Sequence, residues 1–156
     1  MIFISHNKKD EAKALKIKNY LDSKKIRSYI DVLDPSINSS TDITTHIISK
    51  LKESTHIIVV FTEYTKNSMW VPFELGAAYV SEKGIGVFLW TEYQLDLPEY
   101  LDAFPVMKND QDLNQYIDIY NKTTLSKSLT EMFDHVKTAS EKHYAQNFIN
   151  ELKSRI

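Results

Sequence analysis

The sequence contains no cysteine, and this absence excludes several kinds of chemistry. A disulfide scaffold, a thiol nucleophile and a zinc site with cysteine ligands all require a residue that the chain lacks. The five histidines show no metal-ligand spacing with carboxylates, so we expect no metal site. The lack of cysteine also fits a reducing compartment.

Glycine is scarce as well, with three residues among 156: Gly76, Gly84 and Gly86. Neither the glycine-rich turn of a Rossmann dinucleotide site nor a phosphate-binding P-loop is present. A bound dinucleotide is therefore not held in the Rossmann manner as a hydride carrier. The GxSxG motif of a serine hydrolase is also missing.

The chain has no strong excess of one charge and no long apolar run. Its 19 basic and 21 acidic residues give a formal charge of −2, so nucleic acid is not expected as a principal partner. No segment approaches the roughly 20 apolar residues that span a membrane. The first residues also lack the basic start and apolar stretch of a signal peptide. We therefore expect a cytoplasmic protein without membrane contact.

Short apolar runs alternate with amphipathic segments over the first two thirds of the chain. The strongest run, HIIVVFT at residues 56–62, is almost continuously apolar, which is typical of a strand covered on both faces. Further strands are predicted at residues 2–5, 26–32, 85–90 and 103–108. This alternation predicts an α/β domain with a mainly parallel sheet.

Ligands of such sheets bind beyond the carboxyl ends of the strands. The candidate site therefore comprises the segments that follow the strands, at residues 5–10, 31–43, 62–74 and 90–98. A helix is predicted from the end of segment 62–74 to about Lys83, where Gly84 would stop it.

Residues 125–156 carry apolar residues at helical spacing. They are predicted to form a long helix, with a candidate break near Ala139 and Ser140, that packs back on the sheet. Contact with another subunit is a second interpretation of its apolar stripe. We therefore divide the chain into a domain at residues 1–124 and a C-terminal helical extension at residues 125–156.

The stretch SMWVPFELGAA, residues 68–78, places Trp70 and Glu74 four residues apart on one face of the predicted helix. An ionised carboxylate beside an indole plane can hydrogen-bond ribose hydroxyls. It can also stabilise positive charge during cleavage of a glycosidic bond. A structural interpretation makes Glu74 a partly exposed first-turn acid and Trp70 a core residue, and the spacing alone favours it.

Polar side chains also follow the first strand, where His6, Asn7 and Lys8 are candidates to hold a phosphate or a nicotinamide amide. Spacing alone favours a polar turn that caps the next helix. Asp34 lies in a long polar loop and is a candidate substrate contact, although an aspartate before proline is also ordinary turn chemistry.

Two stretches of the sequence resemble TIR (Toll/interleukin-1 receptor-like) domains. IFISHNKKDEAKALKIKNYL is similar to the first conserved box of that family. Residues 31–78 resemble its BB loop, the following helix, the buried strand and the Trp-x-x-x-Glu pair. The similarity covers about residues 1–108 and implies a flavodoxin-like three-layer fold with a five-stranded parallel sheet. The family's third box, a Phe-Trp near the last helix, is not evident, and the helical tail lies outside the pattern.

The resemblance also implies an activity. In enzymatic TIR domains the matching glutamate is the catalytic residue of NAD+ cleavage, which gives Glu74 that role. NAD+ is then the substrate, and no separate cofactor is implied. The resemblance also implies substrate-binding residues. Ser5, His6 and Lys8 would face the nicotinamide side. Trp70 would line the site, and Asp34 would belong to the loop that gates it.

Small standalone bacterial TIR proteins often serve in anti-phage defence of the Thoeris-like kind, where they deplete NAD+ or convert it to a cyclic ADP-ribose isomer. The resemblance therefore implies an NAD+ glycohydrolase or ADP-ribosyl cyclase that forms homo-oligomers through TIR–TIR contacts and signals to a downstream effector. One alternative is a non-catalytic TIR scaffold that acts by self-association. Another is a nucleoside deoxyribosyltransferase-like enzyme, which has a similar sheet and helix. The long loop and Trp70 favour the TIR interpretation.

Overall fold

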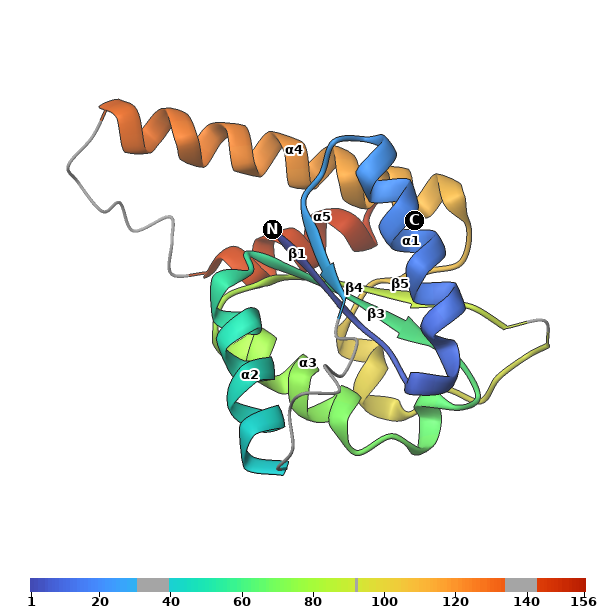
Figure 1. Ribbon diagram of the computed structural model, residues 1–156. Coiled ribbons are helices and arrows are strands. Elements are labelled where there is room, and N and C mark those ends of the chain that lie inside the picture. The colour runs from blue at the N-terminus through green and yellow to red at the C-terminus, as the bar shows by residue number, and fades with distance from the viewer. Residues whose placement is uncertain (31–39, 92, 134–142) are drawn as a thin grey trace.

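Strands and helices alternate in a computed structural model of the chain, which describes residues 1–30, 40–91, 93–133 and 143–156 (Figure 1). In this part of the chain the strands are β1 (Ile2–Ser5), β2 (Ser28–Ile30), β3 (His56–Phe61), β4 (Gly84–Leu89) and β5 (Val106–Met107). The α-helices are α1 (Glu11–Ser23), α2 (Ser40–Glu53), α3 (Trp70–Val80), α4 (Asp110–Phe133) and α5 (Tyr144–Lys153). Short 3₁₀ helices are η1 (Lys8–Asp10), η2 (Thr65–Asn67) and η3 (Glu99–Ala103).

The strands form one parallel sheet in the order β2-β1-β3-β4-β5. This is the flavodoxin-like order, and it confirms the predicted fold class. Ile4 of the inner strand β1 pairs with Ile30 on one side and with Ile58 on the other. The chain leaves β1 toward β2 and returns on the other side as β3, so the strand order reverses between β1 and β3. Ligands of such folds bind beyond the carboxyl ends of the strands at this point.

Side chains of successive strand residues point to opposite faces of the sheet, as a pleated strand requires. Ile58 and Val60 belong to a core on one face, which α1 and α4 cover, whereas Ile57 and Val59 belong to a core on the other face, which α2 and α3 cover (Figure 1). Every residue of β3 is buried, as its apolar run predicted. The result is a three-layer arrangement.

The junction between α3 and β4 differs from its prediction. The helix ends at Val80 rather than near Lys83, and Gly84 begins β4 instead of stopping the helix. The residue in the left-handed region after the helix is Glu82, with φ of 54°. Glycine is needed at position 84 because the His56 ring on the neighbouring strand leaves no room for a side chain. A Cβ there would lie 2.7 Å from Nε2 of His56.

The C-terminal helices also differ from the prediction. Helix α4 begins at Asp110 rather than at residue 125, so it is continuous through residue 124, where the sequence analysis placed a boundary. Helix α5 packs on the sheet through buried apolar residues, as predicted for the tail. The predicted break near residues 139 and 140 lies outside the described residues.

Candidate functional site

A serine and a glutamate meet where the strand order reverses. Ser5 is the last residue of β1, and its hydroxyl donates a hydrogen bond to the carboxylate of Glu74 on α3. Both residues are almost fully buried, with exposed fractions of 1% for Ser5 and 4% for Glu74. The fold thus brings together two residues that the sequence analysis had placed in the same site.

The start of α3 explains where Glu74 lies. The Ser68 hydroxyl accepts a hydrogen bond of 3.4 Å from the N–H of Val71, which satisfies one of the backbone donors at the helix start. Because α3 begins at Trp70, Glu74 belongs to the second turn and not to the first. The expectation of a partly exposed first-turn acid is therefore wrong. The side chain turns inward, toward the end of β1.

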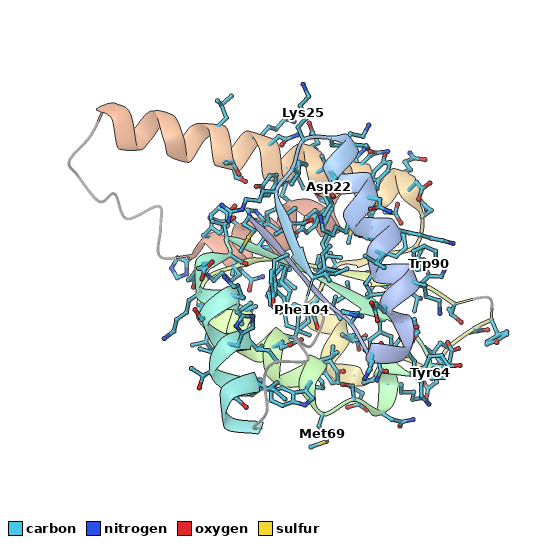
Figure 2. All side chains as sticks on the ribbon, viewed as in Figure 1. Asp22, Lys25, Tyr64, Met69, Trp90 and Phe104 are labelled. Atoms are coloured by element: carbon cyan, nitrogen blue, oxygen red, sulfur yellow. The ribbon has the colours of Figure 1, made fainter. Side chains whose placement is uncertain are left out.

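Trp70 is not a core residue. Its exposed fraction is 43%, and its ring meets that of Phe73 edge to face, with centroids 5.9 Å apart. Phe73 is 45% exposed, and Met69 projects from the surface with 86% of its area exposed (Figure 2). The helix that carries the buried carboxylate thus begins with an exposed apolar surface made of Met69, Trp70 and Phe73.

A second carboxylate is buried at the same end of the sheet. Asp10 is 1% exposed and accepts a hydrogen bond of 2.6 Å from the hydroxyl of Thr62, the residue that follows β3. The Thr65 hydroxyl donates to the same oxygen, Oδ2, over 3.5 Å, and the ammonium of Lys13 lies 3.1 Å from Oδ1. The sequence analysis did not single out Asp10, although it lies in the candidate segment at residues 5–10. A polar residue directly after the most apolar strand, Thr62, was the signal that could have found this contact.

The turn between β1 and α1 is fixed to the loop after β3. The Asn7 side chain accepts a hydrogen bond from the N–H of Lys9 at 3.0 Å and donates one to the carbonyl of Tyr64 at 3.2 Å. Asn7 therefore caps η1, as the structural interpretation of this polar segment predicted. His6 is half-buried and Lys8 is exposed, and their contacts with a substrate stay predictions. Asp34 lies outside the described residues.

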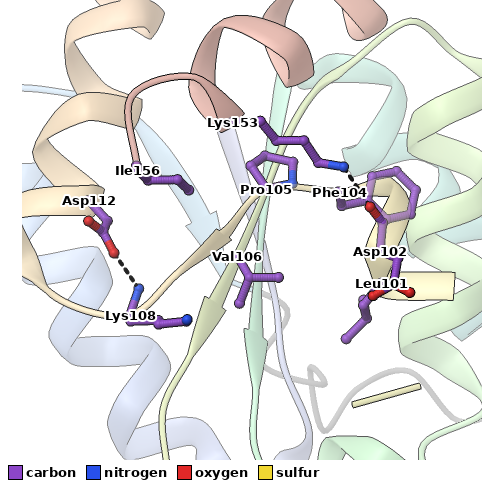
Figure 3. Close-up of a pocket in the computed structure, with 9 residues that line it drawn as sticks. All are labelled: Leu101, Asp102, Phe104, Pro105, Val106, Lys108, Asp112, Lys153 and Ile156. Atoms are coloured by element: carbon purple, nitrogen blue, oxygen red, sulfur yellow. Dashed lines mark hydrogen bonds between the residues drawn. The ribbon is translucent and has the colours of Figure 1, made fainter. Parts of the chain in front are cut away.

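A surface cavity of about 330 Å³ lies elsewhere, at the β5 edge of the sheet (Figure 3). Its lining includes none of the predicted site residues, so it does not belong to the candidate site. The residues that line it are Leu101, Asp102, Phe104, Pro105, Val106, Lys108, Asp112, Lys153 and Ile156.

The described residues lack two features. They contain no group of three or more histidine, aspartate or glutamate side chains placed to hold a metal ion. They also contain no helix that is both long enough and apolar enough to cross a membrane.

Comparisons with known proteins identify the family. No curated protein matches the sequence. Among solved structures, the chain is similar to the crystal structure of the TIR domain of the Toll-related receptor TRR-2 from Hydra magnipapillata, with a TM-score of 0.61 and 14% identity. That similarity covers 78% of this chain and 95% of the Hydra chain, and at this identity it concerns the fold. A family model described as "TIR domain" matches residues 2–132, most of the sequence. The chain therefore belongs to the TIR domain family.

Proposed function

We propose that the protein cleaves the bond between nicotinamide and ribose in NAD+, with Glu74 as the catalytic residue. The family includes both NAD-cleaving enzymes and scaffolds, so membership alone does not decide between them. The observation that supports an enzyme is the buried Glu74 carboxylate, which meets the end of β1 at the point where flavodoxin-like folds bind ligands. A carboxylate in such a place is costly to bury and is therefore a candidate for function.

The chemistry requires a negative charge close to the ribose. As the bond from C1′ to the nicotinamide nitrogen breaks, its electron pair leaves with nicotinamide, and the ribose becomes an oxocarbenium-like cation. Glu74 stabilises that cation and accepts hydrogen bonds from ribose hydroxyls. Attack by water gives ADP-ribose and one proton. Attack by the adenine end of the same molecule gives a cyclic ADP-ribose isomer and one proton.

The burial of Glu74 adds a condition to this proposal. With 4% of the residue exposed, little of Glu74 is open to a ribose until the groups that cover it move. Substrate binding is therefore coupled to a local opening of the site. Trp70, which is 43% exposed, offers an indole face to the substrate without such a movement.

The remaining residues take the roles that the family resemblance implies. His6 follows Ser5 directly and contacts the nicotinamide side, as does Lys8 from η1. Asp34 and its loop gate the pocket. No cofactor takes part, since NAD+ is itself the substrate.

TIR domains generally self-associate, and we extend this to the present chain. Activity then depends on contacts between copies that complete the pocket, and a cyclic product signals to a downstream effector in bacterial anti-phage immunity. The specific activity of the purified protein should fall when it is diluted from the micromolar to the nanomolar range. Full specific activity of a strictly monomeric protein would contradict this part of the proposal.

A test of the activity is mass spectrometry of NAD+ incubated with concentrated protein, with Glu74→Gln alongside. Glutamine keeps the size of this buried side chain, whereas alanine would leave a cavity beside Ser5. We expect the rate of nicotinamide release to fall by at least about 100-fold, the usual effect of removing one electrostatic stabiliser. Glu53→Gln, an exposed residue that pairs with Lys50, is the matched control and should keep the wild-type rate.

The products separate the two outcomes of the reaction. A co-product with the mass of ADP-ribose indicates hydrolysis, and one lighter by a water indicates cyclisation. Wild-type activity in Glu74→Gln would show that Glu74 is not the catalytic residue. No nicotinamide release at any concentration would favour a non-catalytic scaffold, and an assay with deoxynucleosides would then test the deoxyribosyltransferase alternative.

A scaffold is the second candidate function, and one observation favours it. Met69, Trp70 and Phe73 expose apolar area together at the start of α3, and exposed apolar patches of this kind mark contact surfaces. A scaffold would self-associate with unchanged affinity in Glu74→Gln and would release no nicotinamide. Sedimentation of the wild type and this variant, run beside the NAD+ assay, distinguishes the two functions.

A further inference from the structure

The hydroxyl of Ser5 is hydrogen-bonded to Glu74. A serine hydroxyl has one proton to donate, and that proton lies in the hydrogen bond to the Glu74 carboxylate. Ser5 and Glu74 are almost equally buried, at 1% and 4% exposed, so burial does not distinguish their roles. The direction of the Ser5 proton, toward Glu74, favours a role in orienting Glu74.

The two partners differ in how firmly their backbones and side chains are held. Ser5 ends β1, an inner strand, and pairs with Val59 of β3. Its short side chain has one torsion angle to fix. The longer side chain of Glu74 has three torsion angles, so the position of its carboxylate depends on the contacts that it makes. The rigid member of the pair is therefore Ser5.

The chain after Ser5 is also held in place. Thr62 donates to Asp10 over 2.6 Å, and Asn7 donates to the carbonyl of Tyr64 over 3.2 Å. Both contacts join the turn after β1 to the loop after β3. Ser5 thus lies between the paired sheet and a turn with two cross-links, which limits any shift of its hydroxyl.

We infer that Ser5 is a positioning residue that orients the Glu74 carboxylate and favours its ionised form, and that Ser5 does not contact NAD+. This inference rests on the proposed function and corrects the role that the family resemblance implied for Ser5. A hydroxyl that donates to a carboxylate stabilises its charged form. Pre-orientation of a catalytic group raises the rate of the chemical step without changing the binding of the substrate.

The test measures kcat and KM for nicotinamide release from NAD+ with the full chain and three variants. Ser5→Ala removes the hydroxyl, and Ser5→Cys keeps the size of the side chain but supplies only a weak donor. Ser54→Ala is the matched control, because Ser54 is also 1% exposed and its hydroxyl donates to the carbonyl of Lys50 over 2.8 Å, remote from Glu74. Thermal unfolding of each variant verifies that it is folded at the assay temperature.

We expect Ser5→Ala to lower kcat by roughly tenfold to 100-fold, the usual range for losing a hydrogen bond to a charged group, with KM within about twofold of wild type. Ser5→Cys should lower kcat less, and it carries the test alone if Ser5→Ala does not fold. Ser54→Ala should keep both constants. In the Glu74→Gln background, Ser5→Ala should cause no further loss of residual nicotinamide release, because the two residues act as one unit.

Other results overturn the inference. A raised KM with unchanged kcat would mean that Ser5 contacts the substrate, and unchanged constants in both Ser5 variants would mean that it has no role. A full additional loss in the Glu74→Gln background would mean that Ser5 acts independently. These outcomes presuppose an active wild type whose activity is lost in Glu74→Gln. A wild type that releases no nicotinamide would instead overturn the proposed function and the role of Ser5 with it.

Discussion

Two groups of polar side chains lie at opposite ends of β3, and they are built differently. The carboxyl-end cluster sets two carboxylates against hydroxyl groups, and its members are Ser5, Asp10, Thr62, Thr65 and Glu74. The amino-end cluster is centred on an imidazole ring, and its members are Thr55, His56, Tyr116, Thr123 and Tyr144.

The amino-end cluster holds helices against the sheet. His56 is 1% exposed, and its two ring nitrogens lie 2.8 Å from the Thr55 hydroxyl and 2.9 Å from the Tyr144 hydroxyl. Tyr144 in turn donates to Thr123 over 3.0 Å, so this cluster ties α4 and α5 to the sheet. Buried carboxylates are more costly than buried hydroxyl groups, and the two carboxylates of the carboxyl-end cluster lie where flavodoxin-like folds bind ligands. The comparison predicts that changes at the amino end alter stability, whereas changes at the carboxyl end also alter activity.

The largest loss of stability is expected at the amino end, from Gly84→Ala. The new Cβ would lie 2.7 Å from Nε2 of His56 and closer still to its Cδ2, so the ring must move. We expect a loss of about 3 kcal/mol in the free energy of unfolding, as for an overpacked core. Gly76→Ala is the control, because nothing lies within 4 Å of a Cβ on that helical residue, and it should gain about 0.5–1 kcal/mol. Urea unfolding measures both, and equal midpoints would refute the steric account.

The next largest effect is expected at the carboxyl end, from Asp10→Ala. The change removes the acceptor of Thr62 and the ionic partner of Lys13. We expect a loss of about 2 kcal/mol in unfolding free energy, together with slower nicotinamide release. The control is Asp22→Ala, which breaks an exposed pair with Lys18 and should cost less than about 1 kcal/mol. Wild-type activity in a destabilised Asp10→Ala protein would contradict the prediction that changes at the carboxyl end also alter activity.

A pH dependence should follow from the amino-end cluster. Burial raises the pKa of the Tyr116 phenol well above its ordinary value of 10.0, with smaller contributions from Tyr144 and Tyr120. The folded chain therefore keeps a proton that the unfolded chain releases near pH 10. The contribution to stability is complete below pH 10 and is lost as the pH rises further, by up to about 1.4 kcal/mol per pH unit. Urea midpoints between pH 9 and pH 11 should fall less steeply in Tyr116→Phe than in wild type. Parallel curves would contradict this assignment.

The smallest effect is expected from Tyr144→Phe. The change removes the hydroxyl between His56 and Thr123 but keeps the ring, so about 0.5–1 kcal/mol should be lost. The kcat for nicotinamide release should stay at the wild-type value. Tyr79→Phe is the control, since its hydroxyl meets Gln146 on the surface, and no change in the unfolding midpoint is expected. A loss of activity in Tyr144→Phe would show that the two ends of β3 are coupled.

The sequence predicted the features that depend on neighbouring residues. The apolar run at residues 56–62 predicted the buried β3, and the alternation of strands and helices predicted the parallel sheet. The segments after the strands also contain both carboxylates of the carboxyl-end cluster. These features can be recognised from the sequence because each depends on the pattern of apolar residues along one short segment.

The features that sequence reasoning missed depend on distant partners. Glu74 is buried against Ser5, which lies 69 residues earlier in the chain, and the ring of His56 requires glycine at position 84. The start of α4 was missed for a different reason. Asn109 accepts from the N–H of Asp112, and Asp112 accepts from the N–H of Lys108, a reciprocal capping pattern that was present in the sequence and was not used.

The hydrogen bond between Ser5 and Glu74 joins positions 69 residues apart in the chain. Contacts between such distant positions form only after a long loop has closed, which is a slow event in folding. During synthesis on the ribosome, Ser5 emerges early and waits for β3 and α3 to follow. A nascent chain that ends before α3 contains Ser5 and β3 but lacks Glu74. The earliest time at which the contact between Ser5 and Glu74 can form is therefore set by the emergence of α3 and not by the appearance of the first strand.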